Sequence, residues 1–180
     1  MMKIVEPGTE TETAPGTAGE ICVTGPTVMI GYLNNPEGTG QAVKFHADGR
    51  RWVHTGDFGS MDSDGYFRFI QRIKRIVKVS GMPVFPSQIE DVISAVEGVR
   101  EVCVIGIPHP YKMQVIKAFI VPKDPDADKD EIRTRVISEC QAKMIRHAVP
   151  AQIEFRVSLP RTRVGKIDSI RLERENDLRE

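Results

Sequence analysis

Two runs of β-branched and other apolar residues, separated by a short polar turn, limit most strongly what this chain can fold into. The runs are 101–107, "EVCVIGI", and 115–121, "VIKAFIV", and the intervening "PHPYKMQ" is rich in turn-forming residues. Both runs are far shorter than the roughly 20 apolar residues that a membrane-spanning helix needs. We therefore expect two strands of a small sheet and no membrane span.

Helical patterns lie on both sides of these strands. Apolar residues recur at i, i+3, i+4 and i+7 before Gly98, namely Ile89, Val92, Ile93 and Val96. Pro86-Ser87 followed by Glu90 resembles a capping box at the start of this helix. A second helix is expected over 130–147, with Ile132, Val136, Cys140 and Met144 on one side.

The order of elements in this half indicates the fold class. A strand is expected over 153–157, and a short helix after Lys166. Helices and strands in this order predict a compact α+β domain in which helices pack on a small sheet.

The first half has a different character. "PGTETETAPGTAG" is rich in Pro, Gly and Thr, so we expect a loop or frayed end, with ordered structure beginning near Glu20. Short β-rich pieces follow at 21–24, 28–33, 51–54 and 66–70. They predict a small antiparallel β-structure.

A basic segment, "FRFIQRIKRIVKVSG", connects the two halves. In an extended strand its cationic side chains, Arg72, Lys74 and Lys78, would share one face. The opposite face would carry Ile73, Val77 and Val79. Taken alone, this pattern favours a solvated strand face.

Composition excludes several classes of partner and cofactor. Twenty-five basic and 25 acidic residues give a net charge of zero, so the whole surface attracts neither nucleic acid nor anionic lipid. Three unpatterned cysteines favour reduced, buried thiols in a soluble, cytoplasmic protein. The four histidines show no metal-ligand spacing with one another or with cysteine, so no metal is assigned to the protein itself.

Gly165-Lys166 invites comparison with a phosphate-binding loop. The G-x-x-x-x-G-K-[ST] pattern fails, because Leu159 and Arg161 lie where its first glycine would be sought and Ile167 replaces the hydroxyl residue. Lys166 is therefore interpreted as a loop lysine, and its function has to be inferred from the rest of the chain.

Four segments together carry a family resemblance. They are "GEICVTGPTVMIGYLNNPE", "WVHTGDFGSMDSDGYFRF", "QRIKRIVKVSGMPVFPSQIEDVI" and "LPRTRVGKI". From about Gly19 onward the chain resembles the C-terminal third of an adenylate-forming acyl-CoA synthetase. Such enzymes join a carboxylate to ATP as an acyl-adenylate, release pyrophosphate, and transfer the acyl group to coenzyme A.

The resemblance implies roles for individual residues. Asp57 of the T-G-D turn would accept hydrogen bonds from the ribose of ATP, and Arg72 would also reach the nucleotide. Lys166 would be the adenylation lysine, placed between the carboxylate and the α-phosphate. Lys74 would be the hinge of domain rotation, and Gly81 would approach the pantetheine arm of coenzyme A.

The resemblance also implies a domain organisation. Residues 1–73 would be the β-rich end of the N-terminal large domain and 74–180 the mobile α+β lid. The expected cofactors are ATP, Mg²⁺ carried with ATP, and coenzyme A, and the expected partners are the missing large domain and a carboxylic acid. The chain alone is expected to be inactive.

Two other functions stay open. The acyl group could pass to a carrier-protein thiol instead of coenzyme A. Alternatively, the chain could be a non-catalytic module whose basic strand binds an acidic partner; charge reversal at Arg72 and Lys78 would then abolish partner binding.

Overall fold

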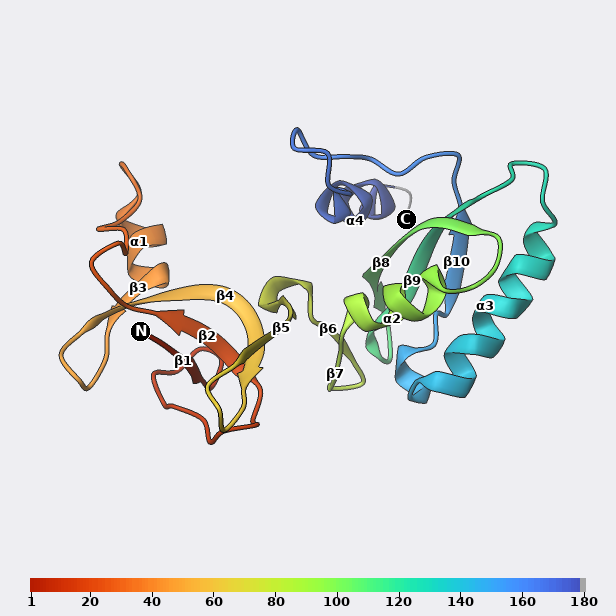
Figure 1. Ribbon diagram of the computed structural model, residues 1–180. Helices are drawn as coiled ribbons and strands as arrows, with labels where there is room; N and C mark the ends of the chain where they lie inside the picture. Colours follow the sequence, from red (N-terminus) through yellow and green to blue (C-terminus); the bar gives the residue numbers. More distant parts are fainter. Residues whose placement is uncertain (179–180) are drawn as a thin grey trace. The chain divides into compact units, whose positions relative to one another are not determined.

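The computed structural model describes residues 1–178. The chain forms two compact units, Met1–Lys74 and a second unit that starts at Arg75. Each is described by itself (Figure 1). No helix in the described part of the chain is both long and apolar enough to cross a membrane.

The first unit is a five-stranded antiparallel sheet. Its strands run in the order β1-β2-β4-β3, and β5 pairs with β4. The strands are β1 (Met2–Val5), β2 (Gly19–Val23), β3 (Val43–Phe45), β4 (Arg51–Met61) and β5 (Phe67–Arg72). A short helix, α1 (Pro36–Ala42), precedes β3. A small core of Val5, Cys22 and Trp52 holds the sheet together.

The expectation that order begins near Glu20 is wrong. β1 pairs antiparallel with β2, with Val5 opposite Glu20, and Ile4 and Val5 are buried. The Pro/Gly/Thr-rich segment is therefore a connection between two strands. Its composition indicates a loop correctly, but it carries no information about the strand before it.

The strand expected at 28–33 is also absent from the structure. This segment consists of turns and bends, and the side chains of Ile30 and Leu33 are 84% and 92% exposed. Apolar character alone does not make a strand where no neighbouring strand offers backbone partners. After it, α1 begins at Pro36, and Asn35 Oδ1 accepts a hydrogen bond from Gly38 N at 2.8 Å.

The second unit is a mixed α+β structure, as expected. Its sheet runs in the order β10-β9-β6-β7, with β8 on β9; the β10–β9 pair is parallel, and the β9–β8, β9–β6 and β6–β7 pairs are antiparallel. The strands are β6 (Val77–Val79), β7 (Met82–Val84), β8 (Val99–His109), β9 (Met113–Pro122) and β10 (Gln152–Phe155). The helices are α2 (Pro86–Ser94), α3 (Lys129–Lys143) and α4 (Ser169–Asp177), with a 3-10 turn, η2, at Arg146–Ala148.

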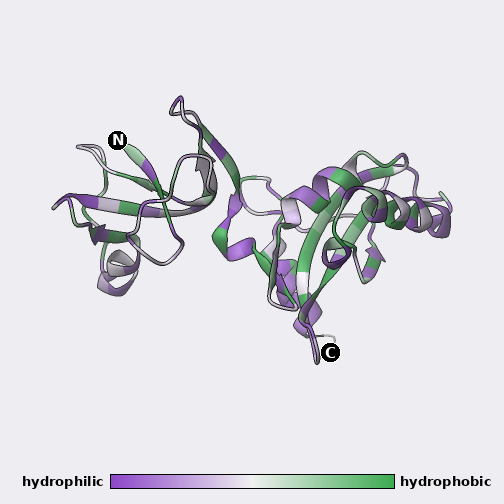
Figure 2. Cartoon of the chain, turned by 90° about the horizontal axis from the view of Figure 1, so that it is seen from below, coloured by the Kyte–Doolittle hydropathy of each residue, from purple (hydrophilic) through white to green (hydrophobic). Residues whose placement is uncertain are grey.

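The β8–β9 hairpin is the centre of this unit, and it is the pair of strands that the sequence predicts. The alternation of side chains along β8 gives it two buried faces. Val102 and Val104 belong to the larger core, which contains Ile89 and Ile93 of α2 and Val136 of α3. On the other face the smaller core consists of Cys103, Ile105, Ile107, Val115, Phe119, Val121, Leu159 and Leu172. Figure 2 shows these strands as the apolar centre of the unit.

The structure differs from three local expectations for this half of the chain. The N-cap of α2 is Phe85 rather than a capping box; Glu90 instead accepts hydrogen bonds from Arg75 Nη2 at 2.6 Å and Val104 N at 2.9 Å. α3 ends at Lys143 instead of His147. The basic segment is not one strand, because a 3-10 turn, η1 (Ile73–Arg75), separates β5 from β6.

Candidate active-site residues

Asp57 and Arg72 come together on neighbouring strands of the first unit. They are directly opposite each other in the β4–β5 register, and Arg72 Nε lies 3.0 Å from Asp57 Oδ1. The guanidinium also donates from Nη1 to the carbonyl oxygen of Thr55 at 2.9 Å. The side chains are 62% and 29% exposed, so the ion pair itself adds at most about 1 kcal/mol to stability. Its effect is to fix the orientation of both groups.

Polar contacts fix the backbone of the turn before Asp57. Thr55 Oγ1 donates to the carbonyl of Ile21 at 2.7 Å and accepts from Asp57 N at 3.1 Å. Gly56 has φ of +71° and donates its N–H to Glu20 Oε1 at 3.0 Å. A positive φ explains why glycine stands at the centre of this motif. The Thr-Gly-Asp turn therefore holds the carboxylate of Asp57 in a fixed position on β4.

Lys166 lies on an exposed loop with a well-defined backbone. Thr162 N donates to the carbonyl of Lys166 at 2.7 Å, and Gly165 N to that of Thr162 at 2.9 Å. Gly165 has φ of +82°, so this turn also needs glycine. After the loop, Asp168 caps α4 by accepting from Arg171 N at 3.0 Å. The lysine is thus displayed on a short hairpin immediately before a capped helix.

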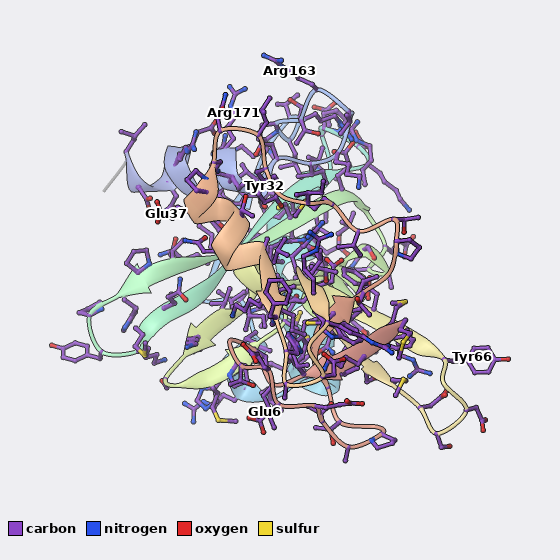
Figure 3. The ribbon with its side chains drawn as sticks, turned by 90° about the vertical axis from the view of Figure 1, so that its left-hand side faces the viewer. Glu6, Tyr32, Glu37, Tyr66, Arg163 and Arg171 are labelled. Carbon is purple, nitrogen blue, oxygen red and sulfur yellow. The ribbon has the colours of Figure 1, made fainter. Side chains whose placement is uncertain are left out.

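Arg161 secures this loop, and the sequence reasoning missed its role. It donates from Nη1 to the carbonyl of Gly165 at 2.8 Å and from Nη2 to Glu101 Oε1 at 2.9 Å. Glu101 belongs to β8, so the guanidinium joins the lysine loop to the central hairpin. Arg163, by contrast, points outward from the tip of the loop (Figure 3). The only sequence signal was a conspicuous arginine close to the lysine.

Gly81 occupies the tight turn between β6 and β7. Ser80 and Gly81 have φ of +51° and +81°, and Val79 pairs with Met82 across the turn. A Cβ added at Gly81 would meet nothing within 4 Å, so one side of the turn is open space. Ser80 N donates to the carbonyl of Lys112 at 2.8 Å, which fixes the turn to the tip of the β8–β9 hairpin.

Lys166 and Gly81 are therefore tied to opposite ends of one hairpin. The lysine loop is joined to Glu101, near the start of β8, and the glycine turn to Lys112, beyond its end at His109. The eight residue-to-residue steps from Glu101 to His109 span about 26 Å at about 3.3 Å per step. These two groups cannot contact one small reacting centre simultaneously.

Lys74 is exposed in the 3-10 turn and is the last residue of the first unit. Directly after it, Arg75 is anchored to the second unit through Glu90, at 2.6 Å, and the carbonyl of Val104, at 3.4 Å. The position at which the polypeptide leaves one unit for the other is thus an exposed lysine followed by an anchored arginine.

The three cysteines are buried free thiols, as expected. Burial raises the pKa of Cys22 and Cys103 to about 12 and that of Cys140 to about 11. They are unsuited to nucleophilic chemistry in this form. The fold does, however, bring Cys22, His46 and His54 together, with one ligand atom from each within 4.8 Å of the others. Linear spacing gave no sign of this cluster.

Comparisons of this chain with known proteins point to the same family of enzymes. Residues 88–166 match the AMP-binding enzyme C-terminal domain. A long-chain-fatty-acid–CoA ligase of Salmonella typhimurium is 43% identical over 158 residues, which make up 88% of this chain and 27% of that ligase. A feruloyl-CoA synthase of an Amycolatopsis species is 37% identical over 154 residues, 85% of this chain and 30% of that protein. The chain thus spans less than a third of the length of these relatives.

A solved structure agrees. The crystal structure of ATP-bound MatB from Rhodopseudomonas palustris matches with a TM-score of 0.85 and 31% sequence identity, over 97% of this chain and 33% of that one. The α+β expectation is confirmed. Residues 88–166 of this chain therefore match the AMP-binding enzyme C-terminal domain, and the resemblance of the chain to the C-terminal portion of the adenylate-forming enzymes is confirmed.

Proposed function

We propose that this chain is the part of a carboxylate–CoA ligase that closes over the reacting groups in two successive orientations. The carboxylate would attack the α-phosphate of ATP and expel pyrophosphate; the thiol of coenzyme A would then attack the acyl carbon and expel AMP. The observation that carries the proposal is the attachment of Lys166 and Gly81 to opposite ends of the β8–β9 hairpin. If adenylation uses the end of the hairpin that carries Lys166 and thioester formation uses the end that carries Gly81, the second unit must change its orientation between the two steps.

In the first unit, Asp57 and Arg72 would bind the nucleotide. A guanidinium has five N–H donors, and two of those of Arg72 are used on Asp57 and on the Thr55 carbonyl. The remaining donors can serve ribose or phosphate oxygens. Asp57 Oδ2 would accept from the ribose hydroxyls, as an ionised carboxylate with no donor of its own.

In the second unit, Lys166 would act in the adenylation step. An ammonium about 3 Å from an anion, at an effective dielectric constant of about 20, gains on the order of 5 kcal/mol before its desolvation is subtracted. A gain of this size changes a rate by several decades. The Arg161 contact to the Gly165 carbonyl would orient the loop, so that little conformational entropy is lost when the lysine engages.

Gly81 would act in the thioester step. Its open side leaves space for the pantetheine arm to pass close to the backbone. Lys74 would be the hinge that absorbs the rotation, because it is exposed and lies at the junction of the units. Magnesium would enter with ATP as part of the substrate complex.

A large N-terminal domain would supply the acyl pocket, and we propose that this chain alone turns over no substrate. Of the two other functions considered, the acidic-partner module needs one continuous basic strand. Arg72 is paired with Asp57, and the 3-10 turn separates it from Lys78 in the other unit. The carrier-protein acceptor would use the same adenylation residues.

The test replaces the corresponding C-terminal part of the Salmonella ligase with this chain and measures the two half-reactions separately. Lys166→Gln should lower pyrophosphate release at least about 100-fold and leave thioester formation from supplied acyl-adenylate within about threefold. Gly81→Leu should lower thioester formation at least about 100-fold and leave pyrophosphate release within about threefold. Lys129→Gln, on the first turn of α3, is the matched control. If Lys166→Gln leaves pyrophosphate release unchanged, the proposed role is refuted; coenzyme A failing as acceptor while a carrier thiol succeeds would favour the second function.

A further inference from the structure

The first unit contains a buried cluster of metal-ligand side chains that the proposed reaction does not use. Cys22 and His54 are directly opposite each other on β2 and β4, so their side chains share one face of the sheet. His46 follows β3, on the other side of β4, and its backbone N donates to the carbonyl of Arg50 at 3.1 Å. We propose that Cys22, His46 and His54 form a zinc-binding site.

The spacing of the cluster suits a tetrahedral ion. One ligand atom of each residue lies within 4.8 Å of the others, and the two Nε2 atoms are 3.0 Å apart. Ligands on zinc stand about 3.3 to 3.6 Å from one another, given Zn–N bonds of about 2.0 Å and a Zn–S bond of about 2.3 Å. The two nitrogens would separate by a few tenths of an ångström, and a pair of ligand atoms at the 4.8 Å bound would approach by about 1.2 Å. All three side chains are buried; Cys22 and His54 lie on paired strands of the sheet, a rigid support, and His46 directly follows β3.

The hydrogen bonds leave the correct nitrogen of His54 free. Its Nδ1 lies 2.9 Å from Glu20 Oε2, and a carboxylate oxygen there fixes the proton on Nδ1. The lone pair of His54 is therefore on Nε2, directed toward His46. A carboxylate bound to the second nitrogen of a histidine ligand is the usual support of a zinc-binding histidine.

His46 can adopt the tautomer that binding needs. In the metal-free chain its Nε2–H would donate to His54 Nε2, and zinc would replace that proton. Among the described residues no hydrogen-bond donor occupies the buried Nδ1 of His46, so this nitrogen can take the proton, at the cost of a buried N–H without an acceptor. The ring is also held in place by stacking on Trp52, with centroids 5.6 Å apart.

Charge and ligand type favour zinc. One thiolate and two imidazoles are a ligand set that zinc accepts, with the fourth position taken by water. Zinc binding would release the thiol proton of Cys22 to solvent. The resulting thiolate and the buried carboxylate of Glu20 together carry two negative charges, which one Zn²⁺ would balance. Because Glu20 also accepts from Gly56 N at 3.0 Å, the ion would brace the Thr-Gly-Asp turn from below.

The test uses the 180-residue chain, refolded with one equivalent of Zn²⁺ or Co²⁺ because the ligands are buried. We expect one tightly held zinc per chain by elemental analysis. Cobalt should give the visible bands of a tetrahedral ion and a thiolate-to-metal charge-transfer band. Cys22→Ser should remove that band, and His46→Gln should weaken binding at least about tenfold. Glu20→Gln should weaken it by roughly 10- to 100-fold. Cys140→Ser, in the second unit, should change nothing.

A second measurement needs no substitution, and it decides the case if a variant does not fold. Zinc should slow alkylation of Cys22 in mild denaturant at least about tenfold, and alkylation of Cys103 and Cys140 much less, as read by mass spectrometry of peptides. A folded wild-type chain without a thiolate–cobalt band, a Cys22→Ser chain that binds as tightly as wild type, or equal protection of all three thiols would each overturn the proposal. None of these readouts depends on ligase activity.

Discussion

Removing the carboxylate of Glu90 should destabilise the second unit. Glu90 lies on α2, and its Oε1 accepts from Arg75 Nη2 at 2.6 Å and from the backbone N of Val104 in β8 at 2.9 Å. The side chains of Arg75 and Glu90 are 32% and 20% exposed. One carboxylate thus joins the start of the unit, a helix and the central hairpin.

The cost of removing this carboxylate can be worked out from these contacts. Both hydrogen bonds end on the charged carboxylate, and bonds of this kind contribute about 1.5 to 3 kcal/mol each, near the lower end where the groups are partly exposed. Arg75 keeps its 3.4 Å contact to the carbonyl of Val104 and some access to water, which reduces the loss. We expect Glu90→Ala to lower the free energy of unfolding by about 2 to 3 kcal/mol. Glu90→Gln keeps an acceptor for Val104 N and should cost about 1 kcal/mol.

Urea unfolding of the chain measures this with an internal control. Far-ultraviolet circular dichroism reports mainly the second unit, which holds α2, α3 and α4, whereas fluorescence of the single tryptophan, Trp52, reports the first. With an m-value of about 1 to 1.5 kcal/mol per M, Glu90→Ala should lower the helical midpoint by roughly 1.3 to 3 M. The Trp52 midpoint should not move.

A matched variant separates this effect from the loss of any glutamate. Glu97 is 91% exposed and lies 3.8 Å from Arg135, so Glu97→Ala should change stability by less than about 0.5 kcal/mol. The reasoning is refuted if Glu90→Ala costs no more than Glu97→Ala, or if Glu90→Gln costs as much as Glu90→Ala.

Two further predictions concern thiols and glycines. Burial raises the pKa of Cys103 and Cys140 in the folded chain to about 12 and 11, so the unfolded chain loses these protons at lower pH. The free energy of unfolding should therefore fall as pH rises above about 9. In urea titrations, the double variant Cys103→Ala-Cys140→Ala should show a smaller fall. Gly81→Ala should cost about 1 to 2 kcal/mol, from its φ of +81° alone, since its Cβ meets nothing. Gly106→Ala should cost more, because its Cβ would lie 2.6 Å from Val77 Cγ1; equal costs would contradict this.

The candidate site was only partly readable from the sequence. Motif resemblance selected Asp57 and Arg72 but did not indicate that they form a 3.0 Å ion pair across β4 and β5. It selected Lys166 but not Arg161, whose contact to Glu101 depends on a strand 60 residues earlier. The roles of all these residues in catalysis stay predictions. Contacts between distant segments leave no periodic trace, so no local pattern could have supplied them.

Some features were determined by the sequence itself. β8, β9, α2 and α3 follow from apolar patterns and turn residues within each segment, because strand and helix periodicity fix which side chains can share a buried face. Only the tertiary structure decided that residues 2–5 form a strand, that the basic segment breaks at 73–75, and that Cys22, His46 and His54 meet. A strand needs backbone partners and a cluster needs converging strands, and both are supplied by parts of the chain far away in sequence.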